Sequence, residues 1–136
     1  MHPIRILTTL ALALAGGISS SLAGAPPPPG KNAVPIFDGK SLAGWEGNAK
    51  LWKVQDGAIA GGSLTETVAR NEFLATEKSY ADFELRAKIK ITGAGGFINS
   101  GIQIRSQRVP NDSEMAGYQC DAGDGWWGKI YDESRR

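Results

Sequence analysis

Residues 82–92 read Asp-Phe-Glu-Leu-Arg-Ala-Lys-Ile-Lys-Ile-Thr, and polar and apolar side chains alternate along the entire run. A period of two is typical of a β-strand that buries one face and exposes the other. The run therefore predicts a long strand whose apolar side chains point into a core: Phe83, Leu85, Ala87, Ile89 and Ile91.

Shorter apolar runs, separated by turn residues, occur on both sides of this stretch. The dipeptide Asp56-Gly57 is typical of a tight turn between two antiparallel strands. From Val34 onward no helical periodicity extends beyond two turns, and the chain contains 18 glycines, which suit tight turns and curved strands. The pattern favours an all-β sandwich or jelly roll. Further strands are expected at 51–55, 57–60, 71–76, 101–107, 117–121 and 129–132.

The N-terminus has the pattern of a signal peptide over residues 1–23. A short basic start is followed by the apolar stretch 6–14 and by small residues at 21–23, which suit a signal peptidase. The alternative is a membrane-spanning anchor, but the apolar run falls short of the roughly 20 residues that a span needs. We expect cleavage before Gly24, or as a second choice before Pro26, with export to the periplasm or the cell exterior and no membrane insertion afterwards.

The rest of the chain is expected to form a spacer and one domain. Pro26 to Pro29 indicate an extended spacer over residues 24–33. The domain occupies 34–136, and its last residues lack the turn or polar tail that usually closes a fold. We therefore expect the domain to be incomplete at its C-terminus, which would weaken its ability to fold alone.

Composition excludes several classes of function. The 15 Lys and Arg residues, one of them Arg5 in the leader, balance 14 Asp and Glu, so no basic surface for nucleic acid is expected. His2 is the only histidine and lies in the leader, so the mature chain lacks histidine zinc ligands and Ser-His triads. Cys120 is the single cysteine and has no histidine partner. We expect it to be a small buried hydrophobe and not a nucleophile.

Six segments occur in a fixed order between residues 37 and 133. They are Phe37-Asp38-Gly39-Lys40-Ser41-Leu42-Ala43-Gly44-Trp45, Trp52-Lys53-Val54-Gln55-Asp56-Gly57-Ala58-Ile59, Phe73-Leu74-Ala75-Thr76, Tyr80-Ala81-Asp82-Phe83-Glu84-Leu85, Asn99-Ser100-Gly101-Ile102 with Arg105, and Gly117-Tyr118-Gln119 with Asp121. Together they resemble the secreted domain of the 3-keto-glycoside lyase/hydratase family, also called 3-keto-disaccharide hydrolases. The resemblance implies an all-β, concanavalin-like jelly-roll sandwich of two antiparallel sheets. Domains of this family continue with further strands beyond the last residue of this chain.

The resemblance also implies a substrate, a sugar oxidised to a ketone at C3. The ketone acidifies the hydrogen on C2, so a base can remove it while the substituent on C1 leaves by β-elimination; water can then add back. Such a site needs a base, an acid for the departing oxygen and a group that polarises the ketone. Without histidine, these roles fall to carboxylates, tyrosines, arginine or a metal ion.

Strand alternation narrows the candidates. Ile102 and Ile104 are expected to face the core, so that Arg105 lies on the opposite, polar face. Gln119 and Asp121 share one face of the neighbouring strand in the same way. We predict that Arg105 and Asp121 lie close together, with Arg105 polarising an oxygen and Asp121 acting as base or metal ligand. The alternative is a surface ion pair, which contributes little to stability.

Further candidates lie in the loops. Glu114 is a second carboxylate at the rim, and Asn99 either makes a tight strand entry or binds sugar hydroxyls. Trp126 and Trp127 suit a stacking platform for a sugar ring, the alternative being one core tryptophan and one partly exposed. After them, Tyr131 or Asp132 is expected to reach the site.

The segment 121–128 alternates Asp and Gly, which resembles a loop for a divalent cation such as calcium. It lacks the spacing and the terminal glutamate of an EF-hand, so the cofactor stays open. Three functions fit the sequence. They are a secreted enzyme for 3-keto-glycosides, a lectin-like carbohydrate-binding module without chemistry, and an inactive fragment of either.

Overall fold

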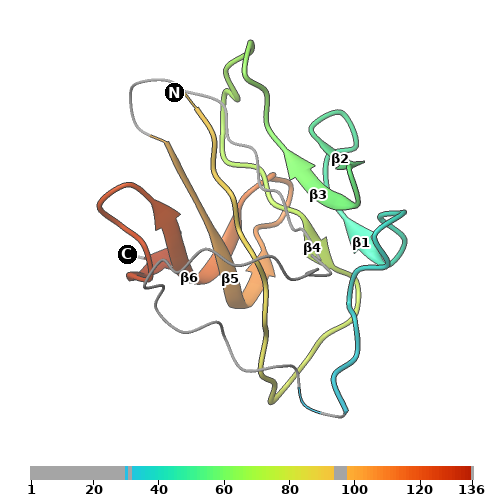
Figure 1. The fold of residues 1–136 in the computed structure, drawn as a ribbon. Coiled ribbons are helices and arrows are strands. Elements are labelled where there is room, and N and C mark those ends of the chain that lie inside the picture. Colours follow the sequence, from blue (N-terminus) through green and yellow to red (C-terminus); the bar gives the residue numbers. More distant parts are fainter. Residues whose placement is uncertain (1–29, 31, 94–97, 136) are drawn as a thin grey trace, which may run out of the picture.

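The computed structural model describes residues 30, 32–93 and 98–135, and within them the protein is all-β, with antiparallel sheets and no helix (Figure 1). The predicted signal peptide and residues 24–29 and 31 of the predicted spacer lie outside the described residues. The all-β prediction is confirmed, while the jelly-roll arrangement stays a prediction.

Two small sheets form one half of the structure. Strand β1 (Trp45–Glu46) pairs with β4 (Ala75–Thr76), and β2 (Trp52–Gln55) pairs with β3 (Ala58–Gly61). The predicted hairpin turn is confirmed, because Asp56 and Gly57 both have positive φ angles, 54° and 72°, as such a turn requires. Of the strand expected at 71–76, only the last two residues pair.

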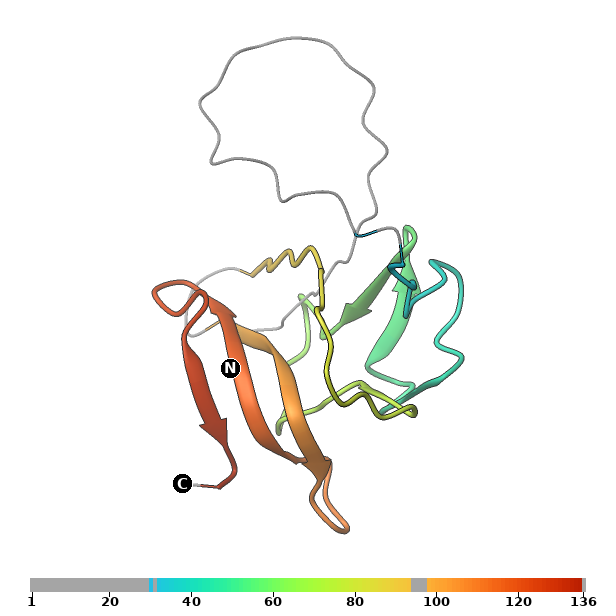
Figure 2. The same ribbon diagram turned by 90° about the horizontal axis from the view of Figure 1, so that it is seen from below.

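The larger sheet contains three antiparallel strands in the order β5-β6-β7 (Figure 2). They are β5 (Asn99–Arg108), β6 (Met115–Gly123) and β7 (Ile130–Glu133). These strands confirm the ones expected at 101–107, 117–121 and 129–132, each at slightly different bounds. The hairpin between β5 and β6 is closed by a hydrogen bond of 2.9 Å from the Val109 N–H to the Glu114 carbonyl.

The prediction of a paired strand at 82–92 is wrong for the described residues. The segment follows β4 and crosses the molecule without joining a β-ladder of the described residues (Figure 2). Phe83 and Leu85, expected in the core, are 49% and 39% exposed. Alternation encodes two faces, but a strand also needs a neighbouring strand, and no described strand forms a ladder with this segment.

The buried apolar core of the described residues is small. It consists of Ala58, Ile59, Ala60, Met115 and Ala122, and no large side chain in the described part is fully buried. Trp52 adds a half-buried ring over Gly61, where an added Cβ would lie 2.6 Å from Trp52 Cε3. Trp45 is also half-buried, and its indole Nε1 donates to the Ile36 carbonyl over 3.1 Å. Trp52 thus covers the strand paired with its own, and Trp45 ties β1 to the loop before it.

The two faces of the larger sheet are reversed relative to the sequence prediction. Ile104, Tyr118, Cys120 and Ile130 lie on a face that is exposed in the described structure, while Gln119 and Asp121 lie on the buried face. The prediction that Cys120 is buried is therefore wrong. No described strand outside this sheet packs over its apolar face.

The opening motif of the domain owes its shape to Asp38. Its Oδ1 accepts hydrogen bonds from the backbone N–H groups of Lys40, at 2.7 Å, and Ser41, at 2.8 Å. These bonds hold the pKa of Asp38 below its usual value, because they stabilise the ionised carboxylate. The Asp-Gly-Lys-Ser sequence therefore encodes a turn and not a reactive group.

Candidate functional site

One face of the larger sheet gathers most of the polar residues expected at the site; we call it the polar face. Directly opposed residues of an antiparallel pair share a face. Gly101 opposes Asp121, Gln103 opposes Gln119, and Gln119 also opposes Tyr131 on the other side. The polar face therefore carries Gln103, Gln119, Asp121, Tyr131 and, two residues beyond Tyr131, Glu133.

Gln119 and Asp121 form the buried centre of this face. Each is 8% exposed, and Gln119 Nε2 donates to Asp121 Oδ1 over 3.0 Å. The Gln119 side chain lies across Gly101, where an added Cβ would be 2.7 Å from Gln119 Cδ. Gly101 thus leaves the space that lets Gln119 hold the carboxylate of Asp121 in one orientation.

Two buried amide oxygens beside this pair have no hydrogen-bond donor. Gln103 Nε2 donates to the Met115 carbonyl over 2.9 Å, but Gln103 Oε1 is buried without a partner. Asn99 Oδ1 is in the same state, and Asn99 opposes Gly123 two positions from Gly101. A buried acceptor without a donor is costly. The polar face therefore presents more acceptors than donors, a composition that suits a ligand rich in hydroxyl groups.

A β-bulge in β5 displaces Arg105 from its predicted position. Ile104 opposes Tyr118 and Gln107 opposes Ala116, so Arg105 and Ser106 both oppose Gly117. Arg105 has a positive φ of 50°. Ser106, not Arg105, covers Gly117, where an added Cβ would lie 2.7 Å from Ser106 Cβ.

The bulge also separates Arg105 from Asp121. Gly117 lies four residues before Asp121 on β6, which corresponds to about 13 Å along a strand. The prediction that Arg105 and Asp121 form a close pair is wrong, because it assumes regular alternation along a ladder without bulges. Arg105 is exposed and shares a row of the sheet with Glu133, which opposes Gly117 from β7.

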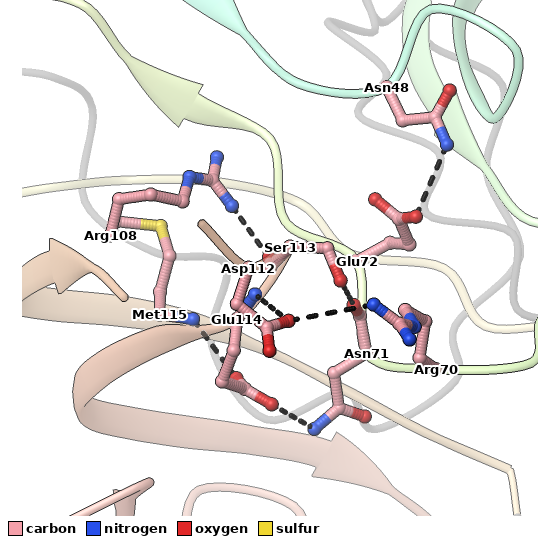
Figure 3. A network of polar contacts seen from close by, with 9 residues as sticks. All are labelled: Asn48, Arg70, Asn71, Glu72, Arg108, Asp112, Ser113, Glu114 and Met115. Atoms are coloured by element: carbon pink, nitrogen blue, oxygen red, sulfur yellow. Dashed lines mark hydrogen bonds and ion pairs between the residues drawn. The ribbon is translucent and has the colours of Figure 1, made fainter. Parts of the chain in front are cut away.

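Glu114 lies in a polar network at the start of β6 (Figure 3). Its Oε2 accepts from Asn71 Nδ2 over 3.0 Å, and its Oε1 accepts from the Met115 N–H over 3.0 Å. Ser113 Oγ donates to the Asn71 carbonyl over 2.7 Å, and Arg108 binds the Ser113 carbonyl over 2.7 Å. The network ties the β5–β6 hairpin to the loop around residue 71. Both oxygens of Glu114 thus have structural partners.

Glu133 is the carboxylate that the sequence analysis missed. Burial raises its pKa above the usual 4.5, and the negative charges of Glu114 and Asp121 raise it further. A period of two from Tyr131 would have placed Glu133 on the same face. Of the two residues weighed there, Tyr131 lies on the polar face; Asp132 opposes Tyr118 and forms a 2.5 Å ion pair with Arg135.

The tryptophan loop joins β6 to β7 beside the polar face. The Asp121 N–H donates to the Lys129 carbonyl over 2.8 Å, and the Gly128 N–H donates to the Asp121 carbonyl over 2.9 Å. Trp126 and Trp127 are 45% and 56% exposed, so neither is a core residue. Lys129 Nζ lies 4.5 Å from the centre of the Trp126 ring and occupies one of its faces. Trp127 is therefore the better stacking surface.

No group of three or more His, Cys, Asp and Glu side chains in residues 30, 32–93 and 98–135 is arranged to hold a metal ion. Over the same ranges there is also no helix of the length and apolarity that crossing a membrane takes.

An all-β chain whose sheet carries amide and carboxylate acceptors next to exposed tryptophans has the character of a carbohydrate-associated domain. Sequence comparison agrees with this class. The model of the 3-keto-alpha-glucoside-1,2-lyase-like domain family matches residues 32–136, and the chain belongs to this family. No curated protein and no solved structure shows significant similarity to the chain. The family resemblance seen in the sequence is thus confirmed, and it links the protein to carbohydrate.

Proposed function

We propose that the protein is an exported carbohydrate-active domain that cleaves 3-keto-glycosides by β-elimination, hydrates the resulting enone, or both. The observation that carries the proposal is the polar face, where a buried carboxylate, Asp121, lies beside two amide oxygens that lack donors, those of Asn99 and Gln103. Such acceptors suit the hydroxyl groups of a sugar. Family membership supports the chemistry, and the larger sheet would be part of a jelly-roll sandwich.

Two of the catalytic roles have a candidate on this face, and the third falls to Arg105 in the bulge of β5. Asp121 is the base: its carboxylate takes the C2 proton, and the electrons of the C–H bond form the C1=C2 double bond. The C1–O bond breaks at the same time, and its electron pair leaves with the glycosidic oxygen. Glu133 is the acid that protonates this oxygen, because its raised pKa favours the protonated form. Arg105 polarises the C3 ketone from the row that it shares with Glu133.

The products are the free aglycone and an enone, 3-keto-2-hydroxyglucal. In the hydration direction, water supplies a hydroxyl group to C1 and a proton to C2 of this enone. In this proposal Asn99, Gln119 and Tyr131 bind sugar hydroxyls, and Glu114 holds the β5–β6 hairpin in place. Trp127 stacks on a sugar ring at the edge of the site.

Enone formation tests the proposal directly. The exported protein is incubated with a 3-keto-glucoside, and the ultraviolet absorbance of the enone is followed. We expect absorbance to rise with the wild type and to rise about a hundredfold or more slowly with Asp121→Asn, because loss of a general base typically costs this much. Asp124→Asn is the matched control, since Asp124 lies exposed in the tryptophan loop.

The absence of enone with the wild type would overturn the lyase proposal, and equal rates for both variants would overturn the role of Asp121. If added enone is also not consumed, the hydratase direction fails as well.

A carbohydrate-binding module is the second candidate, favoured by the exposure of Trp126 and Trp127. This alternative predicts saturable quenching of tryptophan fluorescence by glycosides, loss of that quenching in Trp127→Ala, and no enone. A protein that shows neither quenching nor enone would be the inactive fragment.

The site of action outside the cytoplasmic membrane is likewise our proposal. N-terminal sequencing of the exported protein is expected to begin at Gly24 or Pro26. A protein that retains Met1 would contradict cleavage.

A further inference from the structure

The bulge in β5 brings a hydroxyl group, that of Ser106, onto the polar face. Arg105 and Ser106 together oppose Gly117, which lies on the buried side of β6. Ser106 takes the place that a side chain at 117 would fill. Its Oγ falls almost on the position of an added Gly117 Cβ, and its Cβ lies 2.7 Å from that position. Ser106 therefore belongs to the polar face, where it is half-buried.

Glu133 lies in the same row, on the other side of Gly117. It opposes Gly117 from β7 and is also half-buried. Gly117 has no side chain, so nothing from β6 separates Ser106 from Glu133 within this row. Neighbouring strands lie about 5 Å apart, and two groups bridged by one water are separated by roughly the same distance, two hydrogen-bond lengths. The row therefore suits one small molecule that binds both side chains.

The hydrogen bond that Ser106 makes leaves its oxygen as an acceptor. Its hydroxyl donates to the Ile104 carbonyl over 3.0 Å, two residues back on the same strand. A hydroxyl group has a single proton to donate and two lone pairs. Because the proton points at the backbone, Ser106 Oγ offers lone pairs to the polar face. Its partner there must be a group that carries a hydrogen atom.

We propose that Ser106 and Glu133 together hold the water molecule that adds to the enone. The inference rests on the proposed function and concerns its hydration direction. Water has two hydrogen atoms, so one can bind the Glu133 carboxylate while the other binds Ser106 Oγ. A lone pair of the water oxygen is then free to attack C1. Ser106 is thus a water-binding residue of the site, and Glu133 is the base of this step, the reverse of its role as acid.

The step balances with the groups that elimination leaves behind. After elimination, Glu133 has given its proton to the aglycone, and Asp121 holds the proton from C2. The water oxygen bonds to C1, its proton passes to Glu133, and the electrons of the C1=C2 bond move toward the C3 ketone. C2 then takes the proton from Asp121. Both carboxyl groups and the ketone are restored.

Elimination makes no use of Ser106 in this arrangement. The glycosidic oxygen that leaves C1 carries a carbon atom where water carries its second hydrogen, so it has nothing to donate to Ser106 Oγ. A serine that only supported the fold would affect both directions alike. Separate rates for the two directions therefore distinguish a bound water from a structural role.

These two rates, measured with the exported protein, test the proposal. Loss of the ultraviolet absorbance of added enone measures hydration, and release of the aglycone from a 3-keto-glucoside measures elimination. We expect Ser106→Ala to slow hydration about tenfold, the effect of one lost hydrogen bond, and to leave aglycone release within about twofold. Ser106→Thr keeps the hydroxyl and should hydrate at close to the wild-type rate. Ser100→Ala is the matched control, because Ser100 is a half-buried serine of the same strand outside this row, and it should change neither rate.

A competing nucleophile gives a readout that does not depend on the amount of folded protein. In water with added methanol, the enone yields the hydrated sugar or its methyl glycoside, and nuclear magnetic resonance measures their ratio in one sample. Methanol has a single hydroxyl hydrogen and cannot bind Glu133 and Ser106 Oγ at once. We expect Ser106→Ala to shift the ratio about tenfold toward the methyl glycoside.

Slower hydration with unchanged aglycone release, recovery in Ser106→Thr and a shifted product ratio support the proposal. Equal loss in both directions, or an unchanged ratio with Ser106→Ala, would overturn it and leave the proposed function in place. A wild type that releases aglycone but consumes no enone would overturn the hydration direction and this inference with it. A wild type with neither activity would overturn the proposed function as a whole.

Discussion

The position of the Asp121 carboxylate depends on a residue without a side chain. The Gln119 side chain occupies the space where Gly101 would otherwise carry a side chain, and from there it reaches Asp121. The Cys120 carbonyl oxygen borders the same space. Orientation of a reactive group by a fixed neighbour is how a site reaches working geometry before substrate binds. Gly101 is thus a positioning residue for the proposed base.

Gly101→Ala tests this arrangement. The added methyl group would lie 2.7 Å from Gln119 Cδ and 2.8 Å from the Cys120 carbonyl oxygen, so the side chain and backbone must move apart. We expect the free energy of unfolding to fall by about 1–3 kcal/mol, the usual cost of overpacking. Chemical denaturation measures it. Gly30→Ala, which meets nothing within 4 Å, is the control and should be neutral.

Glu133 gives the protein a predictable response to pH. Its pKa is raised in the folded state, so the folded protein binds this proton more tightly than the unfolded chain. The resulting stabilisation is complete below the unfolded pKa, near 4.5, and is lost as the pH rises through the higher folded pKa. Glu133→Gln should therefore gain stability relative to the wild type at pH 7. We expect that advantage to disappear near pH 4. Chemical denaturation at both pH values measures the difference, and an advantage that grows toward pH 4 would contradict a raised pKa for Glu133.

At the level of elements, the bulge in β5 shows how a site can require local strain. Arg105 adopts a left-handed conformation, which costs a residue with a side chain roughly 1–2 kcal/mol. Bulges often occur next to active sites, where they redirect a side chain. Because of the bulge, the Ser106 side chain packs over Gly117 and the Arg105 side chain is exposed.

Arg105→Gly should separate stability from activity. Glycine relieves the left-handed strain, so we expect the free energy of unfolding to rise by about 0.5–1 kcal/mol. Turnover of a 3-keto-glucoside should fall about a hundredfold if Arg105 polarises the ketone. Asp56→Gly is the matched control, because Asp56 has a φ of 54° in a hairpin far from the polar face. Loss of both stability and turnover in Arg105→Gly would contradict the assignment.

The elements differ in how well the sequence predicts them. The Asp56-Gly57 hairpin is correctly predicted because its turn is specified by two adjacent residues. The segment 82–92 has an equally clear pattern, but pairing depends on a neighbour that no local pattern names. The bulge at Arg105 also cannot be predicted from the alternation of polar and apolar residues. The extra residue shifts the side chains that follow it relative to the partner strand, and the types of residue in the strand do not reveal this shift.

Prediction of the candidate site has the same limits. Gln119, Asp121 and Tyr131 follow a period of two and lie together on the polar face. The pairing of Arg105 with Asp121 was wrong because the bulge intervenes, and Glu133 was missed because its environment is set by burial in three dimensions.

At the level of the whole molecule, stability is limited by the size of the core. Three of the five buried apolar residues in the described structure are alanines, which contribute little buried surface. Apolar residues that are about half exposed or more, among them Phe83 and Ile130, add less stabilisation than buried ones. Both features indicate a free energy of unfolding that is low for a folded domain.

We therefore expect a free energy of unfolding below about 5 kcal/mol for the monomer, with broad melting. Calorimetry of dilute protein measures it, and an environment-sensitive dye should bind the exposed apolar face. A sharp transition with a free energy well above that value in a dilute monomer would show that the described core understates the packing.

Exchange of the C2 hydrogen of a 3-keto-glucoside in deuterium oxide, followed by nuclear magnetic resonance, tests the central claim most directly. Proton abstraction replaces this hydrogen with deuterium or eliminates it, whereas simple binding leaves it in place. The account predicts that the wild type and Asp124→Asn remove the C2 signal and that Asp121→Asn does so about a hundredfold or more slowly. An unchanged C2 signal with the wild type, or equal exchange with Asp121→Asn, would contradict it.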